Sequence, residues 1–451
     1  MNITVIGMGE VGKHIAGFLA AEEHDVTIID SNPLSVADAE ERMDVMALVG
    51  QGGSIKCLRK AEVAKADLVI AVTDDDEANM LAALGAKSLG AKKTIARISS
   101  REYLEGESGV YHDVMGIDLV ICPQILSALE ITKLVKSVGA LMVENFAENR
   151  VELIQLKLNE QLKIVGKTLK EVTMPPNTLI AAVARDDRVI IPSGDDELLL
   201  NDEVLVIGMI EAIEQVEELF GKKHRGKARK AVIVGGGEIG FSLVQSLKGE
   251  QIEVTLIEKD AERCKFLSES LENALIINGD GTSMDILEEV GVAECDIFIS
   301  VVSRGEEVNL LTGLLAKKMG ARKSVVLANK PDYRELYEQL GIDAVVSPRL
   351  VAANQIMKYV RAGRVVSTTI IEEGKAEILE IIAPPSSRIV EKSLKDLNFP
   401  KGAVIGAVVG PKGVMIPTGD DTIAPNSTVI VFTIPSARKR VEKLFKIKMS
   451  E

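Results

Sequence analysis

Two glycine-rich segments have the residue types and spacing of a dinucleotide-binding loop. Residues 7–12 read Gly-Met-Gly-Glu-Val-Gly, and residues 235–240 read Gly-Gly-Gly-Glu-Ile-Gly. In this pattern the first glycine permits a tight turn, the second lets the backbone approach a pyrophosphate, and the third allows close helix–strand packing. The following helix N-terminus then offers unpaired N–H groups to phosphates. The loop residues predicted to contact a nucleotide are Gly7, Met8, Gly9, Glu10, Val11, Gly12, Gly235, Gly236, Gly237, Glu238, Ile239 and Gly240.

An acidic residue follows each loop about 20 residues later, at the end of the next strand-like run. These acids are Asp30 in Val-Thr-Ile-Ile-Asp and Glu258 in Val-Thr-Leu-Ile-Glu. A carboxylate there can hydrogen-bond both ribose hydroxyls and repels a 2′-phosphate, so we expect NAD(H) or another adenine nucleotide rather than NADP. One such motif is a weak signal, but two in the same strand–turn–helix context are a stronger one. The alternative is a Rossmann-like fold with an empty pocket.

The third strand of each copy is expected to end in the ligand crevice. In the second copy the end reads Gly279-Asp280-Gly281-Thr282, and the Asp280 carboxylate could accept from an adenine amino group. In the first copy, residues 51–54 read Gln-Gly-Gly-Ser, without a carboxylate. A glycine-rich turn without ligand contact is the alternative in both copies. The ligand contacts predicted in these turns are Gly53, Ser54, Gly279, Asp280 and Gly281.

The fourth and fifth strands add polar residues to the first site. Thr73 is predicted to contact the ligand, and residues 74–77 form a carboxylate cluster. The cluster could hold a divalent cation, but Asp74 and Glu77 have capping-box-like spacing, so the expectation is helix capping and no metal. Arg97, at the end of the fifth strand, could hold a phosphate or form an ordinary ion pair. The second copy has Leu327 in its place, so the two sites are expected to differ in ligand.

The elements that must position these residues occur twice along the chain. Short apolar runs alternate with amphipathic stretches, such as residues 11–21 and 78–89, which predicts right-handed βαβ crossovers and a parallel, doubly wound sheet. Each such unit is followed by a smaller one whose strands alternate apolar and polar residues. The predicted fold class is therefore α/β, with two Rossmann-like parallel-sheet domains, each followed by a small α+β domain. The predicted ranges are 1–138, 139–222, 229–350 and 366–451.

Three segments are expected to connect these units. Residues 145–150 and 366–375 are predicted to lead into the small units, and the basic residues 222–230 join the halves. A basic run can bind acidic lipid or nucleic acid, but a solvated linker is the simpler interpretation.

Composition restricts the function further. The net charge is −14, which argues against nucleic acid as a partner because phosphate binding needs a basic face. Four separated cysteines indicate thiols in a reducing cytoplasm. No apolar run approaches the roughly 18 residues that span a bilayer, so we expect no direct membrane insertion. The four histidines lie outside any nucleophile or metal motif, so no catalytic residue is predicted: His14, His24, His112 and His224.

These motifs and their order resemble the TrkA family, the cytoplasmic regulatory subunits of Trk potassium-uptake systems. The most specific segments are residues 7–12 with Asp30, residues 71–79, Arg97 in Ile-Ala-Arg-Ile with Tyr103, and residues 279–282. Residues 117–118 and 342–343, which lead to Pro123 and Pro348, match as well. The resemblance covers nearly the whole chain.

The resemblance implies tandem RCK units and a gating subunit that is not an enzyme. It implies NAD(H) and ATP or ADP as ligands, a homotetrameric ring, and a TrkH/TrkG-type membrane potassium channel as partner. The protein would then be cytoplasmic and peripheral on the inner face of the cell membrane. Three positions depart from the family: Glu10 and Glu238 stand where some ATP-binding relatives have Arg, and Gly52 stands where the family often has Asp.

Two other functions remain open. An NAD-dependent dehydrogenase would need a substrate domain with a proton donor, whereas each small unit here is short and lacks histidine. The other alternative is a free-standing NAD or nucleotide sensor with a non-membrane partner.

Overall fold

The computed structural model describes the chain except for the residues in the list that ends this paragraph. His112, His224 and most of the predicted basic linker therefore lie outside the described residues. The residues not described are 23, 101–102, 105–113, 161, 187, 221–227, 304, 329–332, 362–364, 372–373, 391, 412 and 446–451.

The first half begins with a six-stranded parallel sheet in the order β3-β2-β1-β4-β5-β6. This doubly wound order confirms the predicted Rossmann-like fold. Both faces of the sheet are covered by helices, which is why its central strands are almost wholly apolar and buried. The strands are β1 (Asn2–Ile6), β2 (Asp25–Asp30), β3 (Met46–Val49), β4 (Leu68–Ala71), β5 (Lys93–Arg97) and β6 (Leu119–Ile121), and the helices are α1 (Glu10–Ala21), α2 (Pro33–Arg42), α3 (Ile55–Lys60), η1 (Val63–Lys65), α4 (Asp76–Leu89) and α6 (Pro123–Lys136).

The second half repeats this sheet in the order β14-β13-β12-β15-β16-β17, again parallel throughout. The two copies carry the same crossovers, as the sequence repeat predicts. The strands are β12 (Lys230–Val234), β13 (Glu253–Glu258), β14 (Leu275–Asn278), β15 (Ile297–Ser300), β16 (Ser324–Leu327) and β17 (Ala344–Val346), and the helices are α8 (Glu238–Ser246), α9 (Ala261–Ser270), α10 (Met284–Glu289), η4 (Val292–Glu294), α11 (Glu306–Met319), α12 (Tyr333–Gln339) and α13 (Pro348–Arg361).

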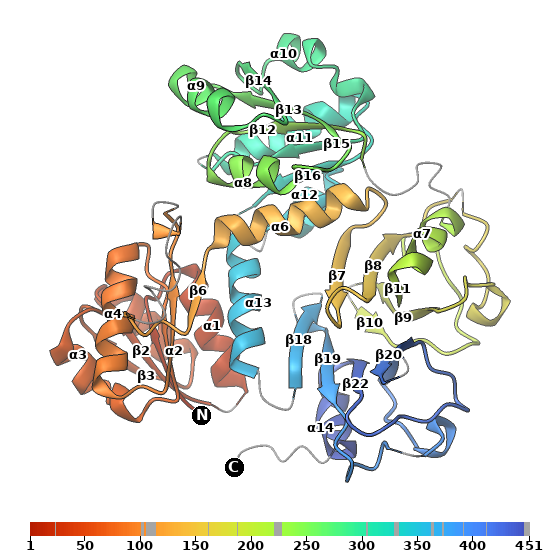
Figure 1. Cartoon of the computed structure of the whole chain (residues 1–451), viewed down its shortest axis with the longest axis horizontal. Helices are drawn as coiled ribbons and strands as arrows, with labels where there is room; N and C mark the ends of the chain where they lie inside the picture. Colours follow the sequence, from red (N-terminus) through yellow and green to blue (C-terminus); the bar gives the residue numbers. More distant parts are fainter. Residues whose placement is uncertain are drawn as a thin grey trace.

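The last helix of each Rossmann unit packs on the other unit. Figure 1 shows α6 running beneath the second sheet domain and α13 lying beside the first. Ile131 and Val135 of α6 are fully buried in one core with Leu243 of α8, while Ile356 of α13 is fully buried with Ile15 of α1. The predicted first domain, residues 1–138, includes α6. The apolar residues of α6 did not indicate that the helix would pack on the second Rossmann domain.

The two small domains are antiparallel sheets that share a core. Their orders are β10-β9-β11-β8-β7 and β18-β19-β22-β20-β21, and buried residues of both, such as Ile207 and Phe432, form one cluster. The elements are β7 (Met142–Phe146), β8 (Val151–Lys157), η3 (Leu169–Glu171), β9 (Thr178–Arg185), β10 (Arg188–Ile190), β11 (Glu203–Met209), α7 (Ile210–Leu219), β18 (Val365–Ile371), β19 (Ala376–Ile382), η6 (Leu394–Asp396), β20 (Ala403–Gly410), β21 (Gly413–Met415), β22 (Thr428–Thr433) and α14 (Pro435–Leu444).

The two predicted linkers into these domains are wrong. Residues 145–146 belong to strand β7, which pairs with β8, and residues 366–371 belong to β18, which pairs with β19. Polar residues in both segments suggested loops. Each segment instead forms an edge strand that pairs with the sheet on one side only.

All four cysteines are buried and free of disulfides. Among the described residues, no helix combines the length and apolar composition that crossing a membrane requires.

Candidate functional site

A cavity of about 660 Å³ opens at the carboxyl edge of the first Rossmann sheet. It lies at the carboxyl ends of the neighbouring strands β1 and β4, where the strand order of the sheet reverses. Doubly wound sheets bind their ligands at this point. Its wall is completed by residues of the second Rossmann domain, so the two domains share it. The predicted site residues that line it are Gly7, Gly9, Glu10, Val11, Asp30, Thr73, Arg97 and Ile239.

The glycine loop between β1 and α1 has no room for side chains at two positions. Gly7 has a φ of +98°, and a Cβ atom there would lie 2.8 Å from the Thr73 nitrogen. A Cβ atom on Gly12 would lie 1.8 Å from the Gly7 carbonyl oxygen. Gly235 and Gly240 repeat both constraints in the second copy. The glycines therefore fix the close turn that brings the N-terminus of α1 to the cavity.

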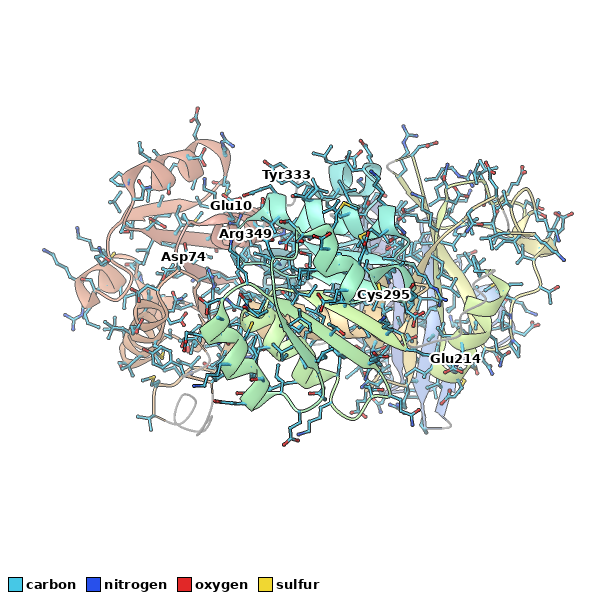
Figure 2. All side chains as sticks on the ribbon, turned by 90° about the horizontal axis from the view of Figure 1, so that it is seen from above. Glu10, Asp74, Glu214, Cys295, Tyr333 and Arg349 are labelled. Atoms are coloured by element: carbon cyan, nitrogen blue, oxygen red, sulfur yellow. The ribbon has the colours of Figure 1, made fainter. Side chains whose placement is uncertain are left out.

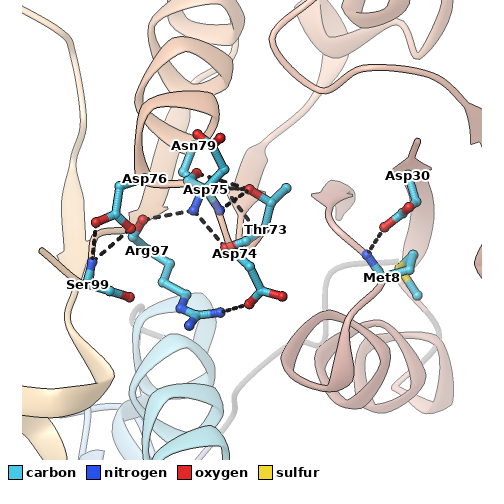
Figure 3. A network of polar contacts seen from close by, with 9 residues as sticks. All are labelled: Met8, Asp30, Thr73, Asp74, Asp75, Asp76, Asn79, Arg97 and Ser99. Atoms are coloured by element: carbon cyan, nitrogen blue, oxygen red, sulfur yellow. Dashed lines mark hydrogen bonds and ion pairs between the residues drawn. The ribbon is translucent and has the colours of Figure 1, made fainter. Parts of the chain in front are cut away.

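The acid at the end of the second strand holds the glycine loop in both copies. Asp30 accepts hydrogen bonds from the Met8 N–H at 2.5 Å and the Asn32 N–H at 2.7 Å, the first of which is drawn in Figure 3. Glu258 accepts from the Gly236 N–H at 2.7 Å and the Asp260 N–H at 2.8 Å. Met8 thus takes part through its backbone, because its side chain is buried.

The carboxylates after β4 have separate protein partners, as Figure 3 shows for Asp74 and Asp76. Asp74 pairs with Arg97 at 2.8 Å, Asp75 accepts from the Ala78 N–H, and Asp76 accepts from the N–H groups of Ser99 and Ser100. Glu77 accepts from the Tyr103 hydroxyl, a bond that lowers the pKa of Glu77. The predicted Asp74–Glu77 capping box is wrong, since Asp75 is the N-cap of α4.

Arg97 points along the wall of the cavity. Its Nη1 atom donates to Asp74, while its Nε atom is buried and has no hydrogen-bond partner among the described residues. Both roles considered for Arg97, ion pair and phosphate ligand, are therefore compatible with its position. Thr73 lies at the end of β4, and its hydroxyl donates to Asn79 at 2.7 Å.

The turn after the third strand has a different register from the one that the sequence suggested. Val49 and Asn278 occupy equivalent places in the two sheets, so Gln51 is the counterpart of Asp280, and Gly52 is the counterpart of Gly281. Accordingly, Gly50, Gln51 and Gly52 line the cavity, while Gly53 contacts Leu81 and Ser54 precedes α3. Position 52 has no room for a side chain, because a Cβ atom there would lie 2.2 Å from the Ile6 side chain.

Asp280 makes an equivalent turn in the second copy. Its Oδ1 atom accepts from the N–H and the hydroxyl of Thr282, and these bonds lower the pKa of Asp280. The carboxylate is therefore ionised at neutral pH, as recognition of an adenine amino group requires. Gly279 and Gly281 flank it and pack on Ile286 and Val234.

The second glycine loop carries an arginine that the first lacks. Arg263 of α9 donates from Nε to the Gly236 carbonyl at 2.8 Å and pairs with Glu238 at 3.1 Å. Its guanidinium also lies 4.8 Å from the ring centre of Phe266. The corresponding residue near the first loop is a serine, Ser35. The two loops thus have similar backbones but different charged partners.

Three residues of these sites were missed from the sequence. Asn79 and Asn309 each bond both strands beside them, and their equal position in the repeat could have identified them. Arg349 enters the first cavity from the second domain and pairs with Glu10 at 3.6 Å, and Figure 2 shows these two residues side by side. No spacing within the chain indicates that approach.

The site fits an adenine nucleotide in volume and in chemistry. Its 660 Å³ is within the usual range for small-molecule pockets. The N-terminus of α1 has no side-chain cap, so its backbone N–H groups can donate to a phosphate, and Arg97 lines the same cavity. When bound, the nucleotide would supply hydroxyls to Asp30 and phosphates to the loop. Within the described part of the chain, no group of three or more His, Cys, Asp or Glu residues could hold a metal ion.

Family models match the chain in the same alternating order as its domains. The model described as the TrkA-N domain matches residues 3–123 and 231–348, and the model described as the TrkA-C domain matches residues 153–221 and 378–446.

Relatives of similar length match along the whole chain. "Trk system potassium uptake protein TrkA homolog 1" of Methanosarcina mazei is 38% identical over 454 residues, covering 99% of this chain and 100% of that protein. A TrkA homolog of Archaeoglobus fulgidus is 36% identical, covering 99% and 100%. The protein named TrkA of Halomonas elongata is 35% identical, covering 100% of both.

Solved structures share the fold. The GsuK RCK domain superposes with a TM-score of 0.61 at 18% identity, covering 99% of this chain and 95% of that one. A GsuK channel bound to NAD gives a TM-score of 0.62 at 17% identity, covering 99% and 79%. The tandem RCK architecture implied by the sequence is thereby confirmed.

Proposed function

The chain belongs to the TrkA family of Trk system potassium uptake proteins, and from that premise we propose that it is the regulatory subunit of a Trk-type potassium channel. In this proposal it binds NAD(H) and ATP or ADP and gates potassium transport by conformational coupling. The observation that carries the proposal is the cavity built around the first glycine loop and shared by both Rossmann domains. A ligand there contacts both halves, so its binding energy can favour one arrangement of the halves over another.

The geometry supports an adenine nucleotide whose ribose carries free hydroxyls and no 2′-phosphate. Asp30 and Glu258 stand at the ends of β2 and β13, where a carboxylate can accept from ribose hydroxyls and repels a 2′-phosphate. A GsuK channel with the same fold has been solved bound to NAD. Arg97 supports a phosphate-rich ligand in the first site, and Leu327 stands in its place in the second.

A sensing role is favoured over hydride transfer by the surroundings of the cavity. Its second wall comes from another Rossmann domain, not from a substrate domain with a positioned acid or base. We propose that the protein is not an enzyme. The dehydrogenase alternative predicts oxidation of NADH with small 2-oxo acids or aldehydes, and steady turnover in such a screen would favour it.

The proposed partner is a TrkH/TrkG-type membrane channel, with four copies of this chain forming a ring on the inner face of the membrane. This proposal is supported by the family and by the potassium uptake named for its relatives. It makes the protein cytoplasmic and peripheral to the membrane. A free-standing sensor would instead use a partner that is not a membrane protein.

Potassium flux through the reconstituted complex tests the proposal. ATP is expected to raise the flux more than ADP, because Arg97 adds a phosphate contact in the first site only. Arg97→Ala should reduce this difference, whereas Arg42→Ala, on the exposed end of α2, should leave it unchanged. Flux that is indifferent to both nucleotides would contradict gating, and failure of the channel to co-purify would favour the free-standing sensor.

A further inference from the structure

The first cavity contains two guanidinium groups that come from different domains. Arg97 ends β5 of the first Rossmann domain, and Arg349 lies in the first turn of α13, which follows the second Rossmann sheet. Both line the cavity together with Glu10, which lies in the first turn of α1. Any phosphate bound at the N-terminus of α1 therefore lies within a space whose positive charges come from both halves of the chain.

Glu10 is the group that such a phosphate would oppose. It stands at the helix N-terminus, where the helix dipole and the unpaired N–H groups favour an anion. Glu10 places a carboxylate in this first turn, and Arg349 Nη1 lies 3.6 Å from it. A phosphate competes with Glu10 for the same helix end and for the same arginine.

The Glu10–Arg349 ion pair is weak enough for a phosphate to replace Glu10 as the partner of Arg349. The two side chains are 57% and 34% exposed, and the separation is near the upper limit of an ion pair. Exposed pairs of this kind are worth about 0–1 kcal/mol. A multiply charged phosphate forms shorter, bidentate bonds with a guanidinium, and these are stronger. The interaction of Arg349 with a phosphate is therefore expected to be stronger than its interaction with Glu10.

The second copy lacks this arrangement. Glu238, the counterpart of Glu10, is held by Arg263 of its own domain. The counterpart of Arg349 is Gln124, since Pro123-Gln124 repeats as Pro348-Arg349, and Gln124 also lines the shared cavity but carries no charge. A guanidinium therefore crosses between the domains in one direction only, toward the first site.

We propose that Arg349 is a phosphate-binding and specificity-determining residue of the first nucleotide site. Arg349 belongs to the opposite domain and changes its partner from the Glu10 carboxylate to the ligand phosphate when the nucleotide binds. The inference rests on the proposed function, because it requires an adenine nucleotide in that site. Ligands with more phosphate charge then draw α13 toward the first glycine loop more strongly. In this proposal position 10 can be a glutamate, because Arg349 of the opposite domain supplies the positive charge that the phosphate needs.

Calorimetric titration of the full chain with ATP, ADP and NADH tests the assignment. Arg349→Gln should weaken ATP binding at the first site by roughly 10- to 150-fold, which is the range of one charge-assisted hydrogen bond. ADP should lose less and NADH least, since they offer less phosphate charge. Arg42→Gln removes the same charge from an exposed position on the first Rossmann domain and should change none of these affinities.

A second variant separates loss of charge from loss of structure. Glu10→Arg in the Arg349→Gln background returns a guanidinium to the loop and should restore most of the ATP affinity. Hydrogen exchange adds a readout of coupling: ATP should slow amide exchange in the first turn of α13 more than ADP does. Arg349→Gln should abolish that difference while leaving ligand protection of the α1 first turn detectable.

Two results would overturn the inference. If Arg349→Gln binds ATP as the unmodified protein does while Asp30→Ala loses affinity, the first site is a nucleotide site but Arg349 is not part of it. If the unmodified protein binds none of the three ligands, both the inference and the proposed function fail.

Discussion

Asp30 and Glu258 have a structural role that needs no ligand, in addition to the ribose contact that we propose for them. Each carboxylate accepts one backbone N–H from the glycine loop and one from the turn that follows its strand. The acid therefore shapes the loop before any ribose arrives. Asp30 also lines the cavity, and a carboxylate can accept several hydrogen bonds, so this residue can hold the loop and make the proposed ribose contact together.

Replacing Asp30 should weaken nucleotide binding strongly. Asp30→Ala removes a charge-assisted acceptor for the ribose and also frees the Met8 N–H, so NADH affinity should fall by roughly 10- to 150-fold. Calorimetry measures this loss. NADPH should bind the unmodified protein markedly less well than NADH, and equal affinity for the two would count against Asp30 as the ribose ligand.

Two glycines of α1 provide a matched test of the loop. Gly12→Ala places a methyl group 1.8 Å from the Gly7 carbonyl oxygen, so the loop must open, and both stability and nucleotide affinity should fall. Gly17→Ala adds the same methyl group five residues later, 3.6 Å from the Met43 side chain, which is ordinary contact. It should stabilise the helix by up to about 1 kcal/mol.

Thermal unfolding of the two glycine variants, with and without NADH, checks this pair. The loop explanation requires Gly12→Ala to lose stability of about 1–3 kcal/mol, the usual cost of overpacking. Equal behaviour of the two variants would show that the close turn is not constrained by Gly12.

At the scale of elements, polar side chains join the strands of each sheet at both edges. Asn79 bonds the backbone at the carboxyl ends of β4 and β5, and Asn309 does so for β15 and β16. At the opposite edge Asp118 accepts from the Thr94 N–H and pairs with Lys87, and Asp343 makes the same contacts. Asn79 and Asn309 thus hold the carboxyl ends of the strands, where the cavity lies, and Asp118 and Asp343 hold the opposite ends.

The Asp118 connection should make stability depend on pH. Burial raises the pKa of Asp118, but the bonds from Lys87 and Thr94 outweigh it, so the pKa is lowered in the folded state. Its stabilisation is therefore complete above the unfolded pKa of about 3.9 and is lost as the pH falls through the folded pKa. Asp118→Asn should cost about 1.5–3 kcal/mol at pH 7.

Chemical denaturation of Asp118→Asn at pH 7 and at about pH 3 measures this effect. The gap from the unmodified protein should shrink at the lower pH, because Asp118 is then becoming protonated in both states. Asp44→Asn, at an exposed position, should show no comparable gap. A gap for Asp118→Asn that stays constant with pH would contradict the electrostatic origin.

The sequence predicts the elements that have strong periodicity and misses those that depend on neighbours. Buried parallel strands such as β4 are continuous apolar runs and were found within a residue. Strands β7 and β18 lie at sheet edges and mix polar with apolar residues, so they resembled loops. The turn after β3 was displaced by one residue because a run of glycines gives no register, whereas strand pairing does.

At the scale of the molecule, the two halves are interlocked. Helix α6 completes the core of the second Rossmann domain, and α13 completes that of the first, as Figure 1 shows. Arg438 of α14 adds a contact between Glu377 of the last small domain and Glu22 of the first Rossmann domain. The halves therefore cannot move without carrying an element of each other, which is the coupling that a sensor needs.

The shared cavity could not be predicted for the same reason. The sequence shows two separate nucleotide motifs, and each was interpreted within its own sheet. Arg349 and Ser303 reach the first site only because the domains face each other. Such contacts depend on packing between distant segments, and a repeat in one chain does not reveal whether its copies meet.

The exchange of helices makes a prediction about half of the chain. Residues 1–220 alone would expose the apolar face of α6, where Ile131 and Val135 are fully buried in the whole protein, and the face of α1 that α13 covers. Because the halves are repeats, α6 of one copy can cover α1 of a second copy, as it covers α8 here. We therefore expect this fragment to form a dimer, which light scattering on a size-exclusion column would measure. Ile131→Asp places a charge in that contact and should keep the fragment monomeric. A fragment that is folded and monomeric at high concentration without this substitution would show that α6 can be buried within its own domain, and the interlocked architecture would then not be required for folding.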